Sequence, residues 1–426
     1  MLSKKLSTNF TLTIYTVSFI SFHIMKQHWK FLLLGITGDL SYKKILPGIA
    51  QFASLHQQEV DIELYGYSRS VPNNEEIRSI LTSNGADETV LPILSYTQGD
   101  YGDNSFFHEL IGTLKEGQRL VVYLAVPPSV FLKFLQNSCP YSNKPIDILI
   151  EKPFGTSATE AKHILNVVSA CDLHQNVHFC DHYLFKNGTF LPEDAKAQLA
   201  QLNPDNLTSI IVKALETVSV EGRLGYYNDT GALKDMLPHL YSLTQLFIDQ
   251  LGQPQHSSVP GQPTVLEFTQ GQYENYLTDL NIPESSTETY FSTTIEQQLD
   301  QKNSVQIRYE SGKKLASKVT SIQASFTDGH SVYWEIQPHS HIVITSSQSE
   351  SEEKSISFPL PDFNILDHTR TFEMLLHANN QRFVSIQNIT RSWELYEAAE
   401  SFKKENQPSI LTPRYIEGQY PLHWVV

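Results

Sequence analysis

Apolar residues between positions 30 and 180 form short runs that alternate with stretches of helical spacing. Five of these runs predict strands, at residues 31–34, 62–67, 120–125, 146–150 and 177–180. Ser157 and Glu160 have the spacing of a capping box, which predicts that a helix begins between the last two strands. Strands that alternate with helices form parallel sheets with helices on both faces. We therefore expect residues 28–181 to form a doubly wound α/β domain.

The pattern changes in the second half of the chain. A strand at residues 210–215 precedes a helical block that contains Leu233, Met236, Leu240 and Leu243. Apolar and polar residues then alternate in four runs, at residues 305–309, 332–336, 342–344 and 356–358. This alternation is typical of an antiparallel sheet with one buried face. Residues 182–426 should therefore form a larger α+β domain with a mostly antiparallel sheet.

Two polar stretches of the second half predict connections rather than strands or helices. Residues 252–286 are rich in Gln, Pro, Gly and Ser, and we expect a long loop or insertion there. Residues 346–354 read SSQSESEEK, which predicts a solvated turn.

The formal net charge of −15 and the pI near 5.5 argue against a nucleic-acid or anionic-membrane surface. They leave a small anionic ligand open, because such a ligand needs only a local group of cations. Cys139, Cys171 and Cys180 are odd in number and lack metal-ligand spacing. We therefore expect reduced thiols, a cytoplasmic protein and no metal site. Residues 1–27 are expected to be a disordered extension or the product of a misassigned start, with Met25 as a natural first residue.

A glycine-bearing turn follows the first predicted strand. Gly35 and Gly38 have the Gly-x-x-Gly spacing of a turn that brings a helix N-terminus close to a pyrophosphate. Thr37 lies in this turn and Lys44 follows it, while Arg69 comes directly after the second strand. An arginine at that place suits the 2′-phosphate of NADP better than the free ribose of NAD. The same residues also fit an ordinary turn and a solvated arginine.

Two charged patches follow later strands of the same half. Lys152 lies in Glu-Lys-Pro-Phe-Gly, residues 151–155, where a lysine can serve both a cofactor and an anionic substrate. Residues 181–186 read Asp-His-Tyr-Leu-Phe-Lys and bring an acid and three possible phosphate donors together. A charged turn with a satisfied histidine is the plainer interpretation of the second patch.

Asp235 and His239 lie four residues apart on a predicted helix, so both side chains could face one cleft. A helical histidine is more often a surface or capping residue than a base. Pro238 between them implies a kink or the start of a helix.

Taken in order, these motifs resemble those of the glucose-6-phosphate dehydrogenase family. The resemblance rests on Gly-x-x-Gly-Asp-Leu at 35–40, Leu-Ala-Val-Pro-Pro-Ser at 124–129, the patches at 151–155 and 181–186, and the Asp235 and His239 pair. It continues through residues 221–223, 312–318, 372–373 and 415–418, and so covers roughly residues 30–425.

The resemblance implies an N-terminal Rossmann-like domain and oxidation of D-glucose 6-phosphate at C1 to 6-phospho-D-glucono-1,5-lactone. This is the first step of the oxidative pentose phosphate pathway, with hydride passing to NADP. His239 would be the base, and Asp181 would orient its imidazole. The implied substrate contacts are Lys152, His182, Tyr183, Lys186, Glu216, Asp235, Lys313 and Lys318. The cofactor contacts are Gly35, Thr37, Gly38, Asp39, Leu40, Lys44, Arg69, Pro127 and Lys152. A homodimer or a dimer of dimers is implied by the resemblance only.

The chain departs from the family pattern in three ways. The family has a step of five between its equivalents of Asp235 and His239, whereas the step here is four. Phe185 stands where the family has glycine, and the chain is short. The four-residue step and Phe185 support a second hypothesis, a catalytically impaired paralogue that binds NADP or a sugar phosphate in a regulatory role. A third is an oxidoreductase of the inositol-dehydrogenase type, which shares Glu-Lys-Pro but lacks the patch at 181–186.

Overall fold

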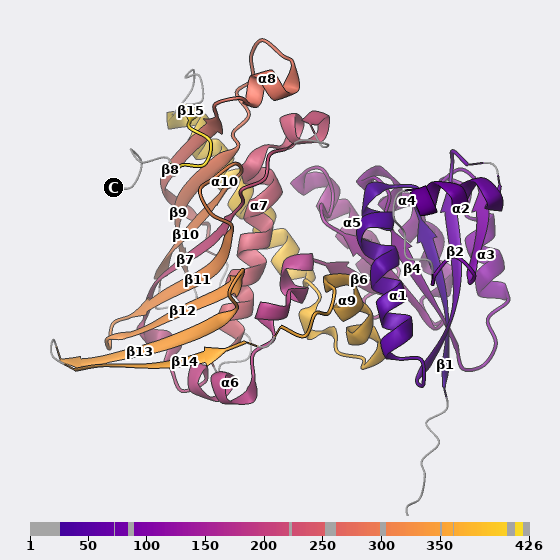
Figure 1. The fold of residues 1–426 in the computed structure, drawn as a ribbon, viewed down its shortest axis with the longest axis horizontal. Coiled ribbons are helices and arrows are strands. Elements are labelled where there is room, and N and C mark those ends of the chain that lie inside the picture. Colours follow the sequence, from indigo (N-terminus) through magenta and orange to yellow (C-terminus); the bar gives the residue numbers. More distant parts are fainter. Residues whose placement is uncertain are drawn as a thin grey trace, which may run out of the picture.

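The computed structural model describes residues 26–71, 73–83, 89–220, 224–251, 261–298, 304–349, 352–360, 362–406 and 414–420. It contains two domains, each built around one sheet (Figure 1). Most of the extension predicted for residues 1–27 lies outside the described residues, although the first strand already begins at Gln27. Of the helices that the structure describes, none combines the length and the apolar character needed to cross a membrane.

The first domain contains a six-stranded parallel sheet with the order β3-β2-β1-β4-β5-β6. Its strands are β1 Gln27–Leu34, β2 Val60–Ser68, β3 Leu94–Gln98, β4 Gln118–Leu124, β5 Ile146–Glu151 and β6 Val177–Cys180. Its helical elements are η1 Ser41–Ile45, α1 Leu46–Leu55, α2 Asn74–Ser83, α3 Ser105–Gly112, α4 Pro128–Ser138, η2 Cys139–Tyr141 and α5 Ala158–Ala170. The predicted Rossmann-like domain is confirmed, and its strand order reverses between β1 and β4, where such sheets bind ligands.

The predicted capping box at the start of α5 is present. Ser157 accepts a hydrogen bond from the backbone N–H of Glu160, and the Glu160 carboxylate accepts one from the N–H of Thr156. The sequence analysis missed β3, whose residues LSYTQ include only one aliphatic side chain and form an edge strand.

A disulfide in the first domain contradicts the expectation of reduced thiols. Cys139 follows α4 and Cys171 ends α5, and the two cysteines are bonded with their Cα atoms 4.9 Å apart. The helices α4 and α5 pack side by side, so their carboxyl ends bring together two residues that are 32 positions apart. Cys180 is free and buried.

The second domain contains a nine-stranded sheet with the order β14-β13-β12-β11-β7-β10-β9-β8-β15. Its strands are β7 Leu207–Leu215, β8 Thr264–Tyr273, β9 Tyr290–Gln298, β10 Ser304–Gly312, β11 Val319–Phe326, β12 His330–Gln337, β13 His341–Ser349, β14 Glu352–Pro359 and β15 Arg414–Tyr415. Only β7 with β10 and β8 with β15 pair in parallel, so the predicted, mostly antiparallel sheet is confirmed.

Two expectations for connections in this domain are wrong. Residues 264–273 form β8 and Tyr276–Leu280 form α8, although the composition of residues 252–286 predicts a long loop or insertion. The polar sequence of β8 becomes a strand because it pairs with β9 over most of its length. Most of the range 346–354, where a turn is expected, lies in strands, because β13 runs to Ser349 and β14 begins at Glu352.

Three helices join the domains. In Figure 1, α7 Leu224–Asp249 and α10 Ile386–Asn406 lie between the large sheet and the first domain. Helix α9 Asp367–Leu376 packs on α1, and its Phe372 is fully buried in the core of the first domain. The remaining short elements are η3 His182–Phe185, η4 Asn187–Thr189, α6 Glu193–Leu199, η5 Pro204–Asn206 and η6 Asn380–Arg382. The predicted boundary between residues 181 and 182 stays a prediction.

Candidate active site

The glycine turn after β1 is packed against the end of β4. Gly35 has a φ of +83°, and a Cβ there would lie 2.1 Å from the carbonyl oxygen of Ala125. The Gly38 N–H and the Ser41 hydroxyl both donate to the carbonyl of Gly35, at 2.9 and 2.8 Å. Only glycine allows this close approach, so the turn is a tight cradle at the carboxyl edge of the sheet.

The other predicted cofactor contacts surround this edge. Arg69 follows β2, is exposed, and holds its guanidinium 5.0 Å from the centre of the Tyr101 ring. Asp39 forms an ion pair with Lys43 at 2.7 Å. Pro127 is exposed and is the N-cap residue of α4.

The imidazole of His239 meets the carboxylate of Asp181, as predicted. His239 on α7 places Nδ1 2.5 Å from Oδ1 of Asp181, which follows β6. Both side chains are buried, at 5% and 1% exposure. Burial alone would raise the pKa of Asp181, but the charge of His239 and its hydrogen bond lower this pKa below the ordinary value. Asp181 is therefore a carboxylate that accepts Nδ1–H and leaves the lone pair of Nε2 available.

A break in α7 explains how His239 reaches Asp181. Gly231 has φ 69° and ψ 171°, so a new helical segment begins after it, seven residues before Pro238. The Glu288 carboxylate accepts from the N–H of Leu233 at 3.0 Å and pairs with Lys403 at 2.7 Å, which anchors this start. The helix is therefore reset before the motif, and the four-residue step does not separate His239 from its partner.

A cavity of about 430 Å³, here the central cavity, collects several of the predicted residues. Leu40, Lys152, His182, Asp235 and His239 line it, so it reaches from the glycine turn to the imidazole. Lys152 donates its ammonium to the backbone carbonyl of Asp235. Burial lowers the pKa of Lys152, although the charges of Asp235 and Asp181 oppose this shift.

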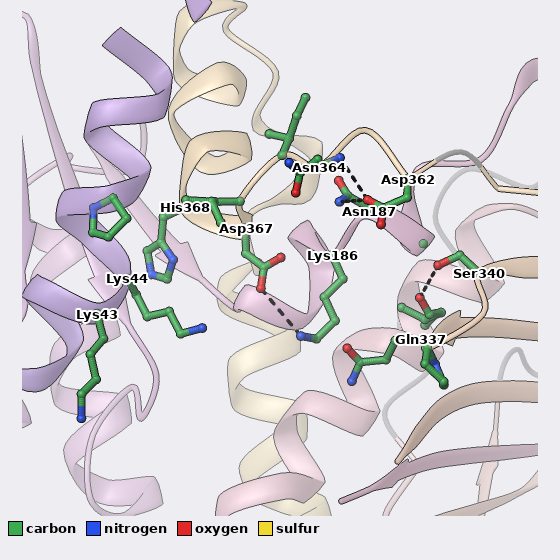
Figure 2. Close-up of a pocket in the computed structure, with 16 residues that line it drawn as sticks. Lys43, Lys44, Lys186, Asn187, Gln337, Ser340, Asp362, Asn364, Asp367 and His368 are labelled. Carbon is green, nitrogen blue, oxygen red and sulfur yellow. Dashed lines mark hydrogen bonds and ion pairs between the residues drawn. The ribbon is translucent and has the colours of Figure 1, made fainter. Parts of the chain in front are cut away.

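Lys186 faces a second cavity of about 400 Å³, here the basic cavity, which Figure 2 shows. Its basic side chains are Lys43, Lys44, Lys186 and His368, and Asp367 lies 3.7 Å from the Lys186 ammonium. The three predicted phosphate donors are thus divided. His182 lines the central cavity and Lys186 lines the basic cavity. The Tyr183 ring centre lies 4.8 Å from the Lys186 ammonium and 4.6 Å from the His239 ring centre.

Burial governs the protonation of two of these donors. Burial, and after it the neighbouring His239 and Lys186, lower the pKa of His182 well below its ordinary value. Burial also raises the pKa of Tyr183, which keeps the phenol protonated. His182 and Tyr183 are therefore neutral donors at pH 7, and Lys186 supplies the positive charge.

The remaining predicted substrate contacts lie outside both cavities. Lys313 forms an ion pair with Glu216, and Lys318 is exposed just before β11. Phe185 is fully buried, and its ring centre lies 5.7 Å from that of Phe383, so its bulk lies in the core and not in either cavity. The motif at residues 221–223 lies outside the described residues.

Further lining residues come from parts of the chain in which no motif predicts a site. Thr156, Thr230, Lys234, Ser392 and Trp393 also line the central cavity, and Gln337, Asp367 and His368 line the basic one. Donor atoms of Asp181, His182 and His239 lie within 4.8 Å of one another, a spacing that a metal ion could use. The expectation of no metal site stays a prediction.

Comparisons with known proteins agree with this geometry. Residues 32–189 match the family model described as the NAD-binding domain of glucose-6-phosphate dehydrogenase. Glucose-6-phosphate 1-dehydrogenase 5, cytoplasmic, of Arabidopsis thaliana is 26% identical over 437 residues, which cover 86% of this chain and 84% of that protein. The cytoplasmic isoform of Solanum tuberosum is 23% identical over 86% of this chain and 84% of its own length.

Solved structures share the fold. A glucose-6-phosphate dehydrogenase in complex with glucose 6-phosphate has a TM-score of 0.73 at 20% identity and covers 93% of this chain and 96% of its own. A Gfo/Idh/MocA family oxidoreductase from Vibrio cholerae has a TM-score of 0.52 at 11% identity and covers 88% and 98%. The motifs, the two-domain fold and these relatives agree: the chain is similar to glucose-6-phosphate dehydrogenases, and its residues 32–189 match the NAD-binding domain of that family.

Proposed function

We propose that this chain oxidises D-glucose 6-phosphate at C1 to 6-phospho-D-glucono-1,5-lactone and transfers the hydride to NADP. The observation that carries the proposal is the buried His239–Asp181 pair, whose imidazole lines a cavity that also reaches the glycine turn. The enzyme names of the relatives that match most of the chain support the same reaction.

The pair has the geometry of an oriented general base. Because Asp181 holds Nδ1–H, the Nε2 atom of His239 can accept the proton of the C1 hydroxyl. As that proton leaves, the electrons of the O–H bond form the C1 carbonyl and the C1 hydrogen departs with its own bonding pair. NADP supplies the acceptor for this hydride when it is bound. The Asp181 carboxylate then stabilises the imidazolium that results.

The glycine turn fits a nucleotide, because the Gly35 backbone approaches Ala125 too closely for any side chain. Gly38, Thr37, Asp39 and Leu40 continue the same turn. We assign NADP rather than NAD on Arg69, whose exposed guanidinium follows β2. Lys152 would serve both ligands from the central cavity, while Lys44 and Pro127 would contact the cofactor from neighbouring loops.

The substrate phosphate is assigned to the side of the site where Lys186 lies. The Lys186 ammonium and the His239 ring centre lie 4.8 and 4.6 Å from the Tyr183 ring centre, so one hexose phosphate could reach both. His182 and Tyr183 would donate neutral hydrogen bonds, and Lys186 would leave its weak 3.7 Å pair with Asp367 to bind the dianion. The other proposed sugar or phosphate contacts are Asp235, Glu216, Lys313 and Lys318. The last three must reorient to reach the substrate.

We infer a homodimer or a dimer of dimers from the resemblance, and a cytoplasmic location from the names of the plant relatives. The Cys139–Cys171 disulfide is of a kind that is rare in reducing compartments. Counting free thiols in protein purified without reductant would show one thiol with the disulfide and three without it.

The experiment is a rate measurement on the purified chain with glucose 6-phosphate and NADP. The proposal predicts formation of NADPH that is lost in His239→Ala. Binding of the nucleotide without turnover of any phosphorylated aldose would instead support the impaired paralogue. Turnover of myo-inositol in preference to sugar phosphates would support the third hypothesis.

A further inference from the structure

Trp393 gives the central cavity an aromatic wall that the proposed reaction has not yet used. We propose that this indole stacks on the nicotinamide ring of the cofactor and binds its oxidised form more tightly than its reduced form. The inference rests on the proposed function. It concerns the choice between the two redox states of the nucleotide.

The indole is held rigidly in the wall of the cavity. Trp393 lies on α10, is 9% exposed, and packs edge-on against Tyr396 with ring centres 5.6 Å apart and planes at 87°. Helix α10 packs against both α5 and α7. Thr156 lies just before the start of α5, and His239 lies on α7. A ligand ring in this cavity therefore meets an indole whose orientation is already set.

The composition of the cavity favours the nicotinamide over the sugar as the partner of this ring. The hydroxyls of a sugar need polar partners, which Lys152, His182, Asp235 and His239 provide. The lining also includes Trp393 and, from the loop after β5 in the nucleotide-binding domain, Phe154 and Gly155. A flat heterocycle that enters over Leu40 finds its aromatic surface there.

The indole already attracts a cation. The Lys234 ammonium lies over its ring, 6.0 Å from the centre, which is the outer limit for a cation–π interaction. The oxidised nicotinamide is a delocalised cation, and it loses this charge when it accepts a hydride. Stacking on Trp393 should therefore favour the oxidised ring and ease departure of the reduced nucleotide, while Lys234 is displaced toward solvent.

The test measures the dissociation constants of NADP and NADPH for the wild type, Trp393→Leu and Trp393→Phe by equilibrium titration. We expect Trp393→Leu to weaken NADP by about 2- to 30-fold, to change NADPH by less than about 2-fold, and Trp393→Phe to recover part of the loss. Equal weakening of both forms, or no change in either, would overturn the proposal. If the wild type turns over its substrate but Trp393→Leu leaves the ratio of the NADP and NADPH dissociation constants unchanged, only this inference is refuted. A wild type that binds neither nucleotide would refute the proposed function as well.

Two further measurements cover a Trp393 variant that folds poorly. Lys234→Met removes the cation that lies over the indole, so the affinity for NADP should stay the same or rise. A loss of affinity of more than about 10-fold would show that Lys234 binds an anion of the ligand, and would refute stacking of the nicotinamide on this face of Trp393. Trp29 and Trp334 are fully buried and Trp424 lies outside the described residues, so in a Trp424→Phe background the quenching of indole emission by NADP should come from Trp393. Undiminished quenching in Trp393→Phe would contradict the stacking.

Discussion

Replacing Asp181 by asparagine tests the central pair most sharply, because it removes one charge and keeps the shape. The Asp181 carboxylate is 1% exposed and accepts hydrogen bonds from Nδ1 of His239 at 2.5 Å and from the backbone N–H of Tyr183 at 3.0 Å. A hydrogen bond to a charged group contributes about 1.5–3 kcal/mol, so kcat should fall by roughly 10- to 150-fold. The amide can also donate to Nδ1 and place the proton on Nε2, where it blocks the base. The loss could then approach about 10⁴-fold.

The same substitution predicts a change in the pH dependence of stability. Burial would raise the pKa of Asp181 in the folded protein, but the charge of His239 and its hydrogen bond lower this pKa below the ordinary value. Its ionisation therefore stabilises the fold above the unfolded value, about 3.9, and this contribution disappears as the pH falls through the folded pKa. The difference in free energy of unfolding between wild type and Asp181→Asn should be largest near neutral pH and shrink below about pH 4. Denaturant titrations at several pH values measure it.

Asp147→Asn is the matched control. Asp147 on β5 is equally buried and pairs with His178 at 2.8 Å and with Arg119 at 2.6 Å, but it lines neither cavity. Asp147→Asn should lower the free energy of unfolding by about 3–5 kcal/mol, because it breaks a buried ion pair, and should leave kcat within about 3-fold of the wild type. The reasoning is refuted if Asp181→Asn keeps its kcat within that range, or if both variants lose kcat equally.

Three other substitutions test the ligand contacts. Lys186→Ala should raise KM for glucose 6-phosphate by roughly 10- to 150-fold and change activity on free glucose little. The control Lys196→Ala removes only an exposed pair with Glu193 and should change neither. Equal losses on both sugars would exclude a phosphate contact. Arg69→Ala should weaken NADP by at least about 10-fold more than NAD in nucleotide titrations, and parallel losses would make Arg69 structural. Gly35→Ala should abolish nucleotide binding, because the added Cβ would meet the backbone of Ala125. The control Gly117→Ala has a similar φ of +79° but lies in open space, so it should lower the free energy of unfolding by only about 1–2 kcal/mol. Similar effects of the two substitutions would contradict the role of the glycine turn in nucleotide binding.

Local patterns in the sequence predicted the parts of the site that follow strands. The carboxyl ends of β1, β5 and β6 meet at one edge of a parallel sheet, so Gly35, Lys152 and Asp181 could be grouped before their distances were known. His239 required a motif match, because nothing local shows that a helix in the second domain points its imidazole back at Asp181. The reset at Gly231 was hidden because it depends on Glu288, a residue 57 positions further along the chain.

The remaining misses share one physical cause, since each depends on contacts between distant segments. Trp393 reaches the central cavity only because α10 packs against α5 and α7, and its own sequence is that of an ordinary helix. Strand β8 has the polar sequence of a loop, and its pairing with β9, which the sequence does not reveal, makes it a strand. Cys139 and Cys171 meet because α4 and α5 end side by side, which no spacing in the sequence reveals.

Deuterium transfer from C1 of glucose 6-phosphate tests the central claim most directly. With substrate deuterated at C1, the account predicts that the reduced nucleotide formed by the wild type carries one deuterium by mass spectrometry. His239→Ala should form this labelled product far more slowly while still binding both ligands. Reduced nucleotide without deuterium, or labelled product formed at the wild-type rate by His239→Ala, would contradict hydride transfer from C1 with His239 as the base.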